Sequence, residues 1–182
     1  MNEWVVDRLA ERHKSGIRRI VEIGPGPGVG LSYLLEAFPA AMVWGLDHSA
    51  VMVRQARRSN SDAVRSGRLM VMRGDPDALA RHAPVDLVLA VNVLYFWADP
   101  CTELQRIRRV LRDNGTMCLA YQLRRHMSPN VQASFPVAGH SLYDADEQVT
   151  KLLRDSGFAK VDVLASGPHR MQLAFNGALG RS

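Results

Sequence analysis

The chain has 182 residues, of which 47% are hydrophobic and 23% are charged. This length and balance predict a single folded domain with a sizeable buried core, and they argue against a disordered or fibrous protein. The formal net charge of +5 attracts anionic partners in general and does not select nucleic acid. No apolar run reaches the length of a membrane span, and the first residues lack the apolar centre of a signal peptide.

The two cysteines, Cys101 and Cys118, have neither metal-ligand spacing nor the pattern of a disulfide framework. We therefore expect a reducing, cytoplasmic location and no bound metal. Cys118 lies within an apolar stretch and is expected to be a small core residue.

A short amphipathic helix is expected over residues 4–12, with Trp4, Val5 and Leu9 on its buried side. An apolar strand is expected over residues 20–23, and glycines then alternate along the chain up to Gly30. Apolar residues at helical spacing follow over residues 31–38. A strand, a glycine-rich turn and a helix form the first half of a βαβ unit.

The glycine-rich turn favours a ligand without phosphate groups. A dinucleotide-binding turn has the pattern G-x-G-x-x-G, but counted from Gly24 its third glycine position falls on Val29. Pro25 and Pro27 also remove two N–H donors that would hold phosphate. The carbonyl oxygens that remain favour a ligand with an ammonium group.

The stretch E-x-G-x-G-x-G resembles the first motif of class I S-adenosylmethionine-dependent methyltransferases. S-adenosylmethionine has no phosphate, and its methionine tail carries an ammonium group. The resemblance implies that this cofactor binds here and leaves as S-adenosylhomocysteine. The residues that it places at the cofactor from this motif are Glu22, Gly24, Pro25, Gly26 and Gly28.

A second strand, expected over residues 41–46, ends at Asp47. A carboxylate there can accept hydrogen bonds from the ribose hydroxyls of a nucleoside. The alternative is that Asp47 only caps the helix expected over residues 50–59, but Ser49 is better placed for that. The run from Asp47 to Met52 also resembles the family's segment, which implies that His48 lies at the cofactor and Met52 packs near the adenine.

A third strand, expected over residues 68–72, ends before Asp75 and Pro76. In the family an aspartate at this point bonds the adenine amino group, so the resemblance places Asp75 and Pro76 at the adenine. The alternative is that Asp75 caps a short helix over residues 77–81, since Pro76 suits a first helical turn.

A nearly continuous apolar strand is expected over residues 85–91, as at the centre of a parallel sheet. Asn92 follows it, at the end where ligands bind in open α/β sheets, so we expect Asn92 at the cofactor. Residues 92–100 resemble the equivalent segment of small-molecule methyltransferases and include Tyr95, a candidate acceptor contact. They do not match the Asn-Pro-Pro-aromatic tetrad of enzymes that methylate nucleobase or glutamine amines.

Asp99 and Pro100 are expected to begin a helix with Leu104, Ile107 and Leu111 on one face. A strand over residues 116–121 follows.

Residues 122–143 are a candidate lid, because they show no clear period and leave the carboxyl end of that strand. His126, His140 and Tyr143 are further candidate acceptor contacts. The alternative is that each is an ordinary surface residue.

A helix over residues 144–156 is expected to begin with a capping box of Asp144 and Glu147, and a hairpin closes the sheet. The predicted fold is a three-layer α/β/α sandwich with a seven-stranded sheet, six strands parallel and one antiparallel. It is a single methyltransferase domain over residues 1–182, with a short helix in residues 1–19.

The predicted function is methyl transfer to a small-molecule acceptor. An RNA or protein acceptor and a non-catalytic cofactor-binding module remain alternatives. Nucleic acid is not favoured as a partner, a membrane is not expected, and a homodimer is left open. No residue in the sequence compels the role of a general base.

Overall fold

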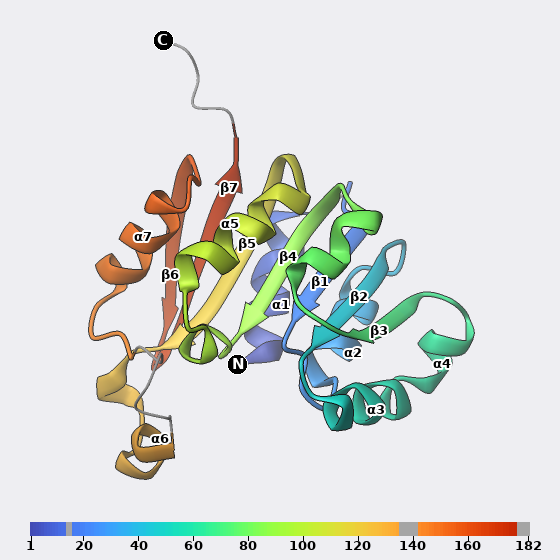
Figure 1. Cartoon of the computed structure of the whole chain (residues 1–182), viewed down its shortest axis with the longest axis horizontal. Coiled ribbons are helices and arrows are strands. Elements are labelled where there is room, and N and C mark those ends of the chain that lie inside the picture. The colour runs from blue at the N-terminus through green and yellow to red at the C-terminus, as the bar shows by residue number, and fades with distance from the viewer. Residues whose placement is uncertain (14–15, 135–141, 178–182) are drawn as a thin grey trace.

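The computed structural model describes residues 1–13, 16–134 and 142–177. Its centre is a seven-stranded sheet in the order β3-β2-β1-β4-β5-β7-β6 (Figure 1). Strand β7 is antiparallel to β5 and β6, and the pairs from β3 to β5 are parallel, which confirms the predicted sheet. The strands are β1 (Arg19–Ile23), β2 (Met42–Asp47), β3 (Leu69–Arg73), β4 (Val85–Val91), β5 (Leu111–Gln122), β6 (Lys160–Ser166) and β7 (His169–Asn176).

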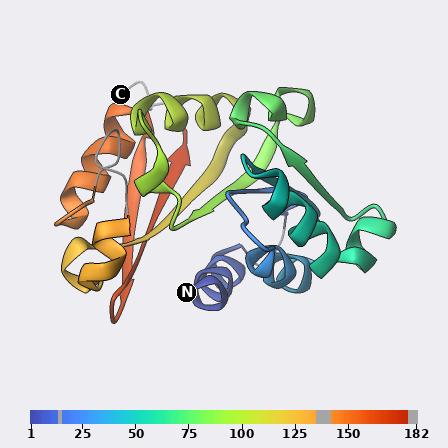
Figure 2. The same cartoon turned by 60° about the horizontal axis from the view of Figure 1, so that its bottom comes forward.

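Helices cover both faces of the sheet, as Figure 2 shows. One face packs against α1 (Asn2–Arg12), α2 (Val29–Ala37) and α3 (Ala50–Ser59). The other packs against η1 (Pro76–His82), α5 (Pro100–Val110) and α7 (Asp146–Asp155). Shorter helical turns are α4 (Ser61–Arg65), η2 (Leu94–Phe96), η3 (Arg124–His126) and α6 (Pro129–Ser134).

Burial on both faces explains the composition of the central strands. The first six residues of β4 are all buried, as expected for a strand covered by helices on each side. In β1, Val21 and Ile23 face the η1 and α5 layer, whereas Ile20 faces the α1 and α2 layer. Because strand side chains alternate, Glu22 shares the face of Ile20 and lies against Gly30 at the start of α2.

Several details differ from the sequence predictions. Leu111 begins β5 instead of ending α5, and the pairing of β4 with β5 shifts register after this point. The prediction of an Asp144–Glu147 capping box was wrong, because Gln148 Oε1 accepts the N–H groups of Asp144 and Ala145 at 2.7 and 3.1 Å. The longer glutamine side chain reaches back over the turn, and α7 begins two residues later than predicted.

In α1, Val5, Val6 and Leu9 are buried and Trp4 is only half-buried. The predicted core position of Cys118 is confirmed, since its side chain is fully buried. Among the described residues, none of the helices combines the length and apolar character needed to cross a bilayer.

Candidate functional site

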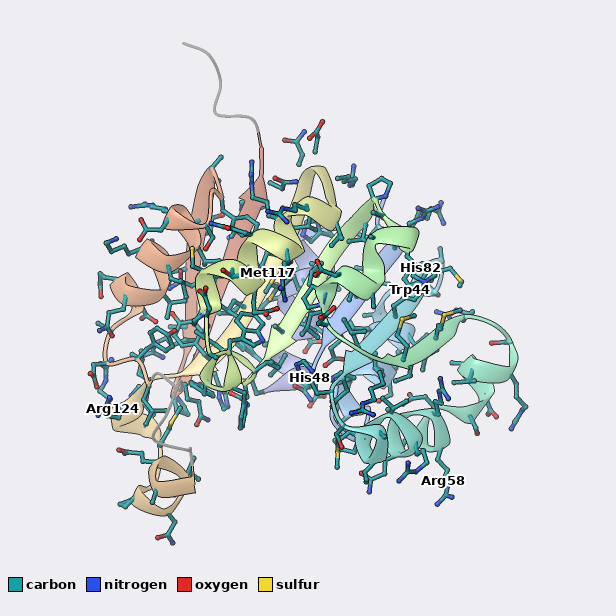
Figure 3. The ribbon with its side chains drawn as sticks, in the orientation of Figure 1. Trp44, His48, Arg58, His82, Met117 and Arg124 are labelled. Atoms are coloured by element: carbon teal, nitrogen blue, oxygen red, sulfur yellow. The ribbon has the colours of Figure 1, made fainter. Side chains whose placement is uncertain are left out.

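The loops that follow β1, β2 and β4 meet at the carboxyl edge of the sheet, where Figure 3 labels His48. The order of the strands reverses between β1 and β4, and open α/β sheets bind ligands at such a point. The loops enclose a hollow of about 490 Å³, which we call the large hollow and which lies within the usual size range of ligand pockets. Its lining residues are Gly24, Gly26, Asp47, His48, Ser49, Met52, Val91, Asn92, Val93 and Phe96.

Three glycines of the loop after β1 have positive φ angles, 65° at Gly24, 53° at Gly26 and 93° at Gly28. A Cβ atom on Gly24 would lie 2.7 Å from a methyl carbon of Val93, and one on Gly28 would lie 2.7 Å from the Asn60 amide nitrogen. A Cβ atom on Gly26 would meet nothing within 4 Å. Gly24 and Gly28 therefore permit close packing, while Gly26 keeps the wall of the large hollow open.

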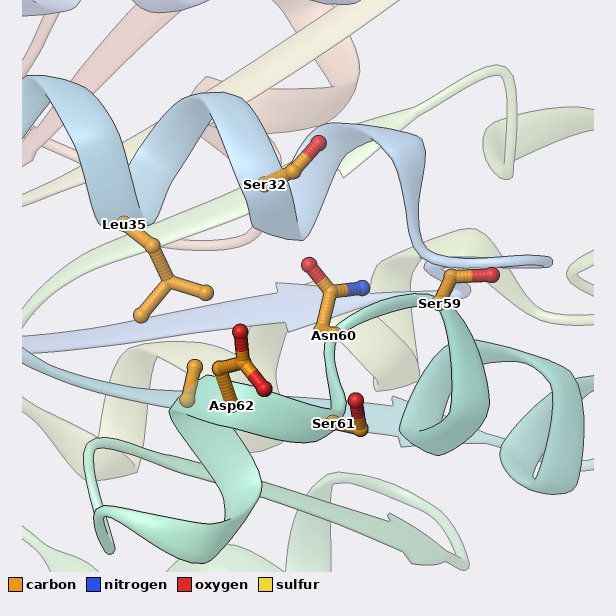
Figure 4. Close-up of a pocket in the computed structure, with 7 residues that line it drawn as sticks. Ser32, Leu35, Ser59, Asn60, Ser61 and Asp62 are labelled. Carbon is orange, nitrogen blue, oxygen red and sulfur yellow. The ribbon is translucent and has the colours of Figure 1, made fainter.

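Asn60 holds the glycine loop from behind. Its Nδ2 donates to the carbonyl oxygens of Gly28 at 3.0 Å and of Ala56, in α3, at 3.1 Å. In Figure 4, Asn60 lies between α2 and the turn from α3 to α4, where it lines a groove of about 230 Å³. Sequence reasoning missed this residue, since its only signal was an asparagine directly after a helix.

The carboxylate of Asp47 links the glycine loop to the start of α3. Its Oδ2 accepts the Gly26 N–H at 3.1 Å, and its Oδ1 accepts the Ser49 N–H at 2.8 Å. Ser49 Oγ in turn accepts the Met52 N–H at 3.3 Å, so the predicted Ser49 cap is confirmed. Asp47, His48 and Met52 all lie on the wall of the large hollow.

Asp75 is a helix cap in this structure. Its Oδ1 accepts the Asp77 N–H at 3.1 Å at the start of η1. Its side chain is exposed, Pro76 is buried, and neither residue lines the large hollow. The adenine contact of Asp75 and Pro76 stays a prediction.

Glu22 and Pro25 support the loop from outside the large hollow. Glu22 is only 2% exposed, and its Oε2 has no hydrogen-bond partner among the described residues. Burial raises the pKa of Glu22 to about 8. Pro25 is buried and packs against β2, where a Cβ atom on Gly45 would lie 3.2 Å from its ring.

A second hollow of about 220 Å³, which we call the small hollow, adjoins the large one and shares Asn92 and Phe96 with it. The other lining residues are Tyr95, Gln122, Met127 and Val131. Asn92 has a positive φ of 56°, a conformation that asparagine adopts more readily than most residues, and its N–H donates to Ala120 O at 2.8 Å.

The hydroxyl group of Tyr95 is held at the end of β5. It donates to Gln122 O at 3.0 Å and accepts the Gln122 N–H. Burial raises the pKa of Tyr95 to about 12, so the phenol is protonated at neutral pH. Tyr95 can shape the small hollow but is not a base there.

The other predicted acceptor contacts do not line the small hollow. His126 is half-buried, Tyr143 packs into the core with 8% of its surface exposed, and His140 lies outside the described residues. Sequence reasoning missed Phe96, Gln122, Met127 and Val131 as lining residues. Only Phe96 had a usable signal, as an aromatic residue directly after the predicted Tyr95.

Within the described part of the chain, no group of three or more His, Cys, Asp or Glu side chains is placed to hold a metal ion. A sequence profile described as a methyltransferase domain matches residues 20–115, which is more than half of the chain. The chain belongs to this family. The matched residues carry the glycine loop, Asp47 and Asn92, and they include every described residue that lines the large hollow.

Similar proteins include several methyltransferases. Trans-aconitate 2-methyltransferase from Azoarcus sp. (strain BH72) is 36% identical over 120 residues, which are 66% of this chain and 44% of that protein. The uncharacterized methyltransferase YdaC of Bacillus subtilis (strain 168) is 26% identical over 169 residues, which are 90% of this chain and 82% of that protein. The chain spans about half the length of the first trans-aconitate 2-methyltransferases that it matches.

Solved structures of methyltransferases share the fold. An O-methyltransferase family protein from Burkholderia thailandensis superimposes with a TM-score of 0.77 at 15% identity, over 98% of this chain and 57% of that one. S-adenosylmethionine is the cofactor that membership of the methyltransferase family implies for this chain. The large hollow fits it, because its volume suits a nucleoside-sized ligand and the missing side chain of Gly26 leaves room beside the loop.

Proposed function

We propose that this protein transfers a methyl group from S-adenosylmethionine to a small-molecule acceptor and releases S-adenosylhomocysteine. The observation that carries the proposal is that the two hollows adjoin and share Asn92 and Phe96 as lining residues. The large hollow would hold the cofactor beside the glycine loop. The small hollow would hold the acceptor next to it.

The residues of the large hollow would bind the cofactor mainly through the backbone. The carbonyl groups of Gly24 and Gly26, which line the large hollow, would offer acceptors to the ammonium group, and Asp47 would offer a carboxylate to the ribose hydroxyls. His48, Met52 and Asn92 would complete this wall, and Glu22 and Pro25 would support it.

When bound, S-adenosylmethionine supplies a methyl group that its sulfonium already activates. The protein's own tasks are then to align the acceptor and to exclude water. Among the described residues of the small hollow, the polar groups are the amides of Asn92 and Gln122 and the protonated phenol of Tyr95. None of these is a base at neutral pH, so the acceptor would bring a nucleophile that needs no base from this wall.

A macromolecular acceptor has less support. Several arginines that could contact RNA are already engaged within the protein: Arg57 donates to Val71 O, and Arg106 and Arg124 form ion pairs with acidic neighbours. Arg58, by contrast, points away from the protein on α3 (Figure 3). A non-catalytic binding module is also less favoured, because the described residues leave the small hollow open beside Tyr95.

The cellular location and the oligomeric state of the protein are also proposals. We propose the cytoplasm, because Cys101 and Cys118 are free cysteines. A homodimer would offer a second subunit to help cover the small hollow during methyl transfer.

Calorimetry tests the cofactor. S-adenosylhomocysteine should bind, and NAD and NADP should not bind comparably, because Pro25 and Pro27 remove donors that phosphate needs. The reverse preference would reject the proposal. Transfer of a labelled methyl group should then be measured on a library of small acceptors, with total RNA and protein as competing acceptors. Transfer to RNA or protein alone would favour the macromolecular alternative.

A further inference from the structure

The small hollow also indicates the chemical class of the acceptor. We propose that the acceptor presents a neutral and largely apolar group to the small hollow, in contrast to the carboxylate-rich trans-aconitate named for several relatives. This inference rests on the proposed function, because it assumes that the small hollow is the acceptor site.

Among the described residues that line the small hollow, none carries a charged side chain. Phe96, Met127 and Val131 contribute apolar surface, and Tyr95 contributes its ring while its hydroxyl is bonded to Gln122. The amides of Asn92 and Gln122 are neutral polar groups that can orient a hydroxyl or carbonyl. A carboxylate moved from water into such a site would lose hydration without gaining a cationic partner.

The cations nearest in sequence to this wall are turned to other partners. Arg124 Nε lies 3.2 Å from Asp144 Oδ1, and Arg125 donates to Asp144 O at 3.0 Å. The sequence of residues 135–141 contains neither lysine nor arginine. The adjoining large hollow carries the Asp47 carboxylate, whose negative charge opposes an anionic acceptor.

The shape of the wall is held in place by α6 and the turn before it. Gln132 Nε2 donates to Arg124 O at 3.1 Å and to Met127 O at 3.0 Å, and Met127 N–H donates to Arg124 O at 3.0 Å. The volume of about 220 Å³ lies below the usual range of about 300–1,000 Å³ for complete ligand sites. The small hollow therefore suits a small acceptor, or one end of a longer one.

The methionines allow a direct test by nuclear magnetic resonance of the full chain labelled at its methionine methyl carbons. Met52 lines the large hollow and Met127 lines the small one, while Met42 on β2 and the buried Met171 lie outside both. S-adenosylhomocysteine should shift the Met52 signal. With that ligand saturating, the uncharged phenol 1-naphthol should shift the Met127 signal, and trans-aconitate should not at the same concentration.

A Met127 shift with trans-aconitate at equal or lower concentration would overturn the inference. The inference would also be overturned if 1-naphthol left the Met127 signal unchanged, or if it shifted the Met42 signal as strongly as the Met127 signal. Failure of S-adenosylhomocysteine to shift Met52 would instead reject the cofactor site, so the two failures can be told apart.

Two valines provide a matched pair of variants. Val131, in the small hollow, is 44% exposed, and Val163, on β6, is 47% exposed. Val131→Asp should weaken the Met127 response to 1-naphthol by about tenfold or more, because it places a charge in an apolar wall. Val163→Asp should leave the response unchanged, and both variants should keep the Met52 response to S-adenosylhomocysteine. Equal effects of the two variants on the Met127 response would overturn the inference.

Discussion

The two hollows are built in different ways. The large hollow is shaped by backbone geometry, with glycines at positive φ angles and a carboxylate that accepts the Gly26 N–H. The small hollow is shaped by apolar and amide side chains from the turn after β4, η2, the end of β5, the turn before α6 and α6 itself. A backbone site needs particular residue types at fixed spacing, whereas a side-chain wall can be built from many combinations of residues.

The sequence profile of the family covers the two hollows to different extents. The methyltransferase profile covers residues 20–115, which include the glycine loop, Asp47 and Asn92. Gln122, Met127 and Val131 lie beyond it. The matched range therefore includes every described lining residue of the large hollow but only half of those of the small hollow.

The largest expected effect comes from a side chain on Gly26. Gly26→Val should weaken the binding of S-adenosylhomocysteine by roughly a hundredfold or more, because its branched side chain would enter the space that the loop leaves open. Calorimetry measures the affinity, and circular dichroism checks that the helices remain.

Gly167, in the β6–β7 hairpin, is a matched control. It has a φ of 54°, close to the 53° of Gly26, and a Cβ atom there would also meet nothing within 4 Å. Gly167→Val should therefore cause similar backbone strain without affecting the cofactor. Equal losses of affinity in both variants would mean that strain, and not the large hollow, explains the effect.

A smaller loss is expected at Asp47. Asp47→Ala removes a carboxylate that could accept ribose hydroxyls, and charge-assisted hydrogen bonds contribute about 1.5–3 kcal/mol. Affinity for S-adenosylhomocysteine should fall by about ten- to a hundredfold in calorimetry. Asp75→Ala is the comparison, because Asp75 caps η1 outside the large hollow. If Asp75 contacts the adenine as predicted, Asp75→Ala should also weaken the binding of S-adenosylhomocysteine. An unchanged affinity would mean that Asp75 serves only as the cap of η1.

Much of the fold could be predicted because local patterns and tertiary packing agree. The bounds of β4 were predicted from an apolar run, and those of α3 from a serine cap and a helical period. The seven-stranded sheet followed from the resemblance to the family. Six of the residues predicted at the cofactor line the large hollow, because the positions of Gly24, Gly26 and Asp47 are fixed by strand ends.

Contacts between distant segments could not be predicted. Nothing near Asn60 in the sequence indicates that its amide would bond Gly28, 32 positions earlier. Likewise, no local pattern distinguishes Met127 and Val131 from ordinary core or surface residues. Which side chains converge on the small hollow depends on how the chain returns after β5, and periodicity carries no information about that path.

The smallest expected effect on affinity is at Glu22, behind the glycine loop. Burial raises its pKa from 4.5 to about 8, so the folded protein holds this proton more tightly than the unfolded chain does. Its contribution to stability is complete below pH 4.5 and is lost as the pH rises to about 8. The free energy of unfolding should therefore decline over this range in the wild type, and less steeply in Glu22→Gln, which cannot ionise.

Urea unfolding at several pH values measures this difference, with Glu36→Gln on the exposed side of α2 as the control. At neutral pH most Glu22 side chains are protonated, so Glu22→Gln should change S-adenosylhomocysteine affinity by less than about threefold. A backbone-built site predicts this tolerance, because the loop geometry does not require a charge at Glu22. A tenfold loss would instead show that the charge of Glu22 takes part in binding, and the large hollow would then depend on a buried side chain as the small one does.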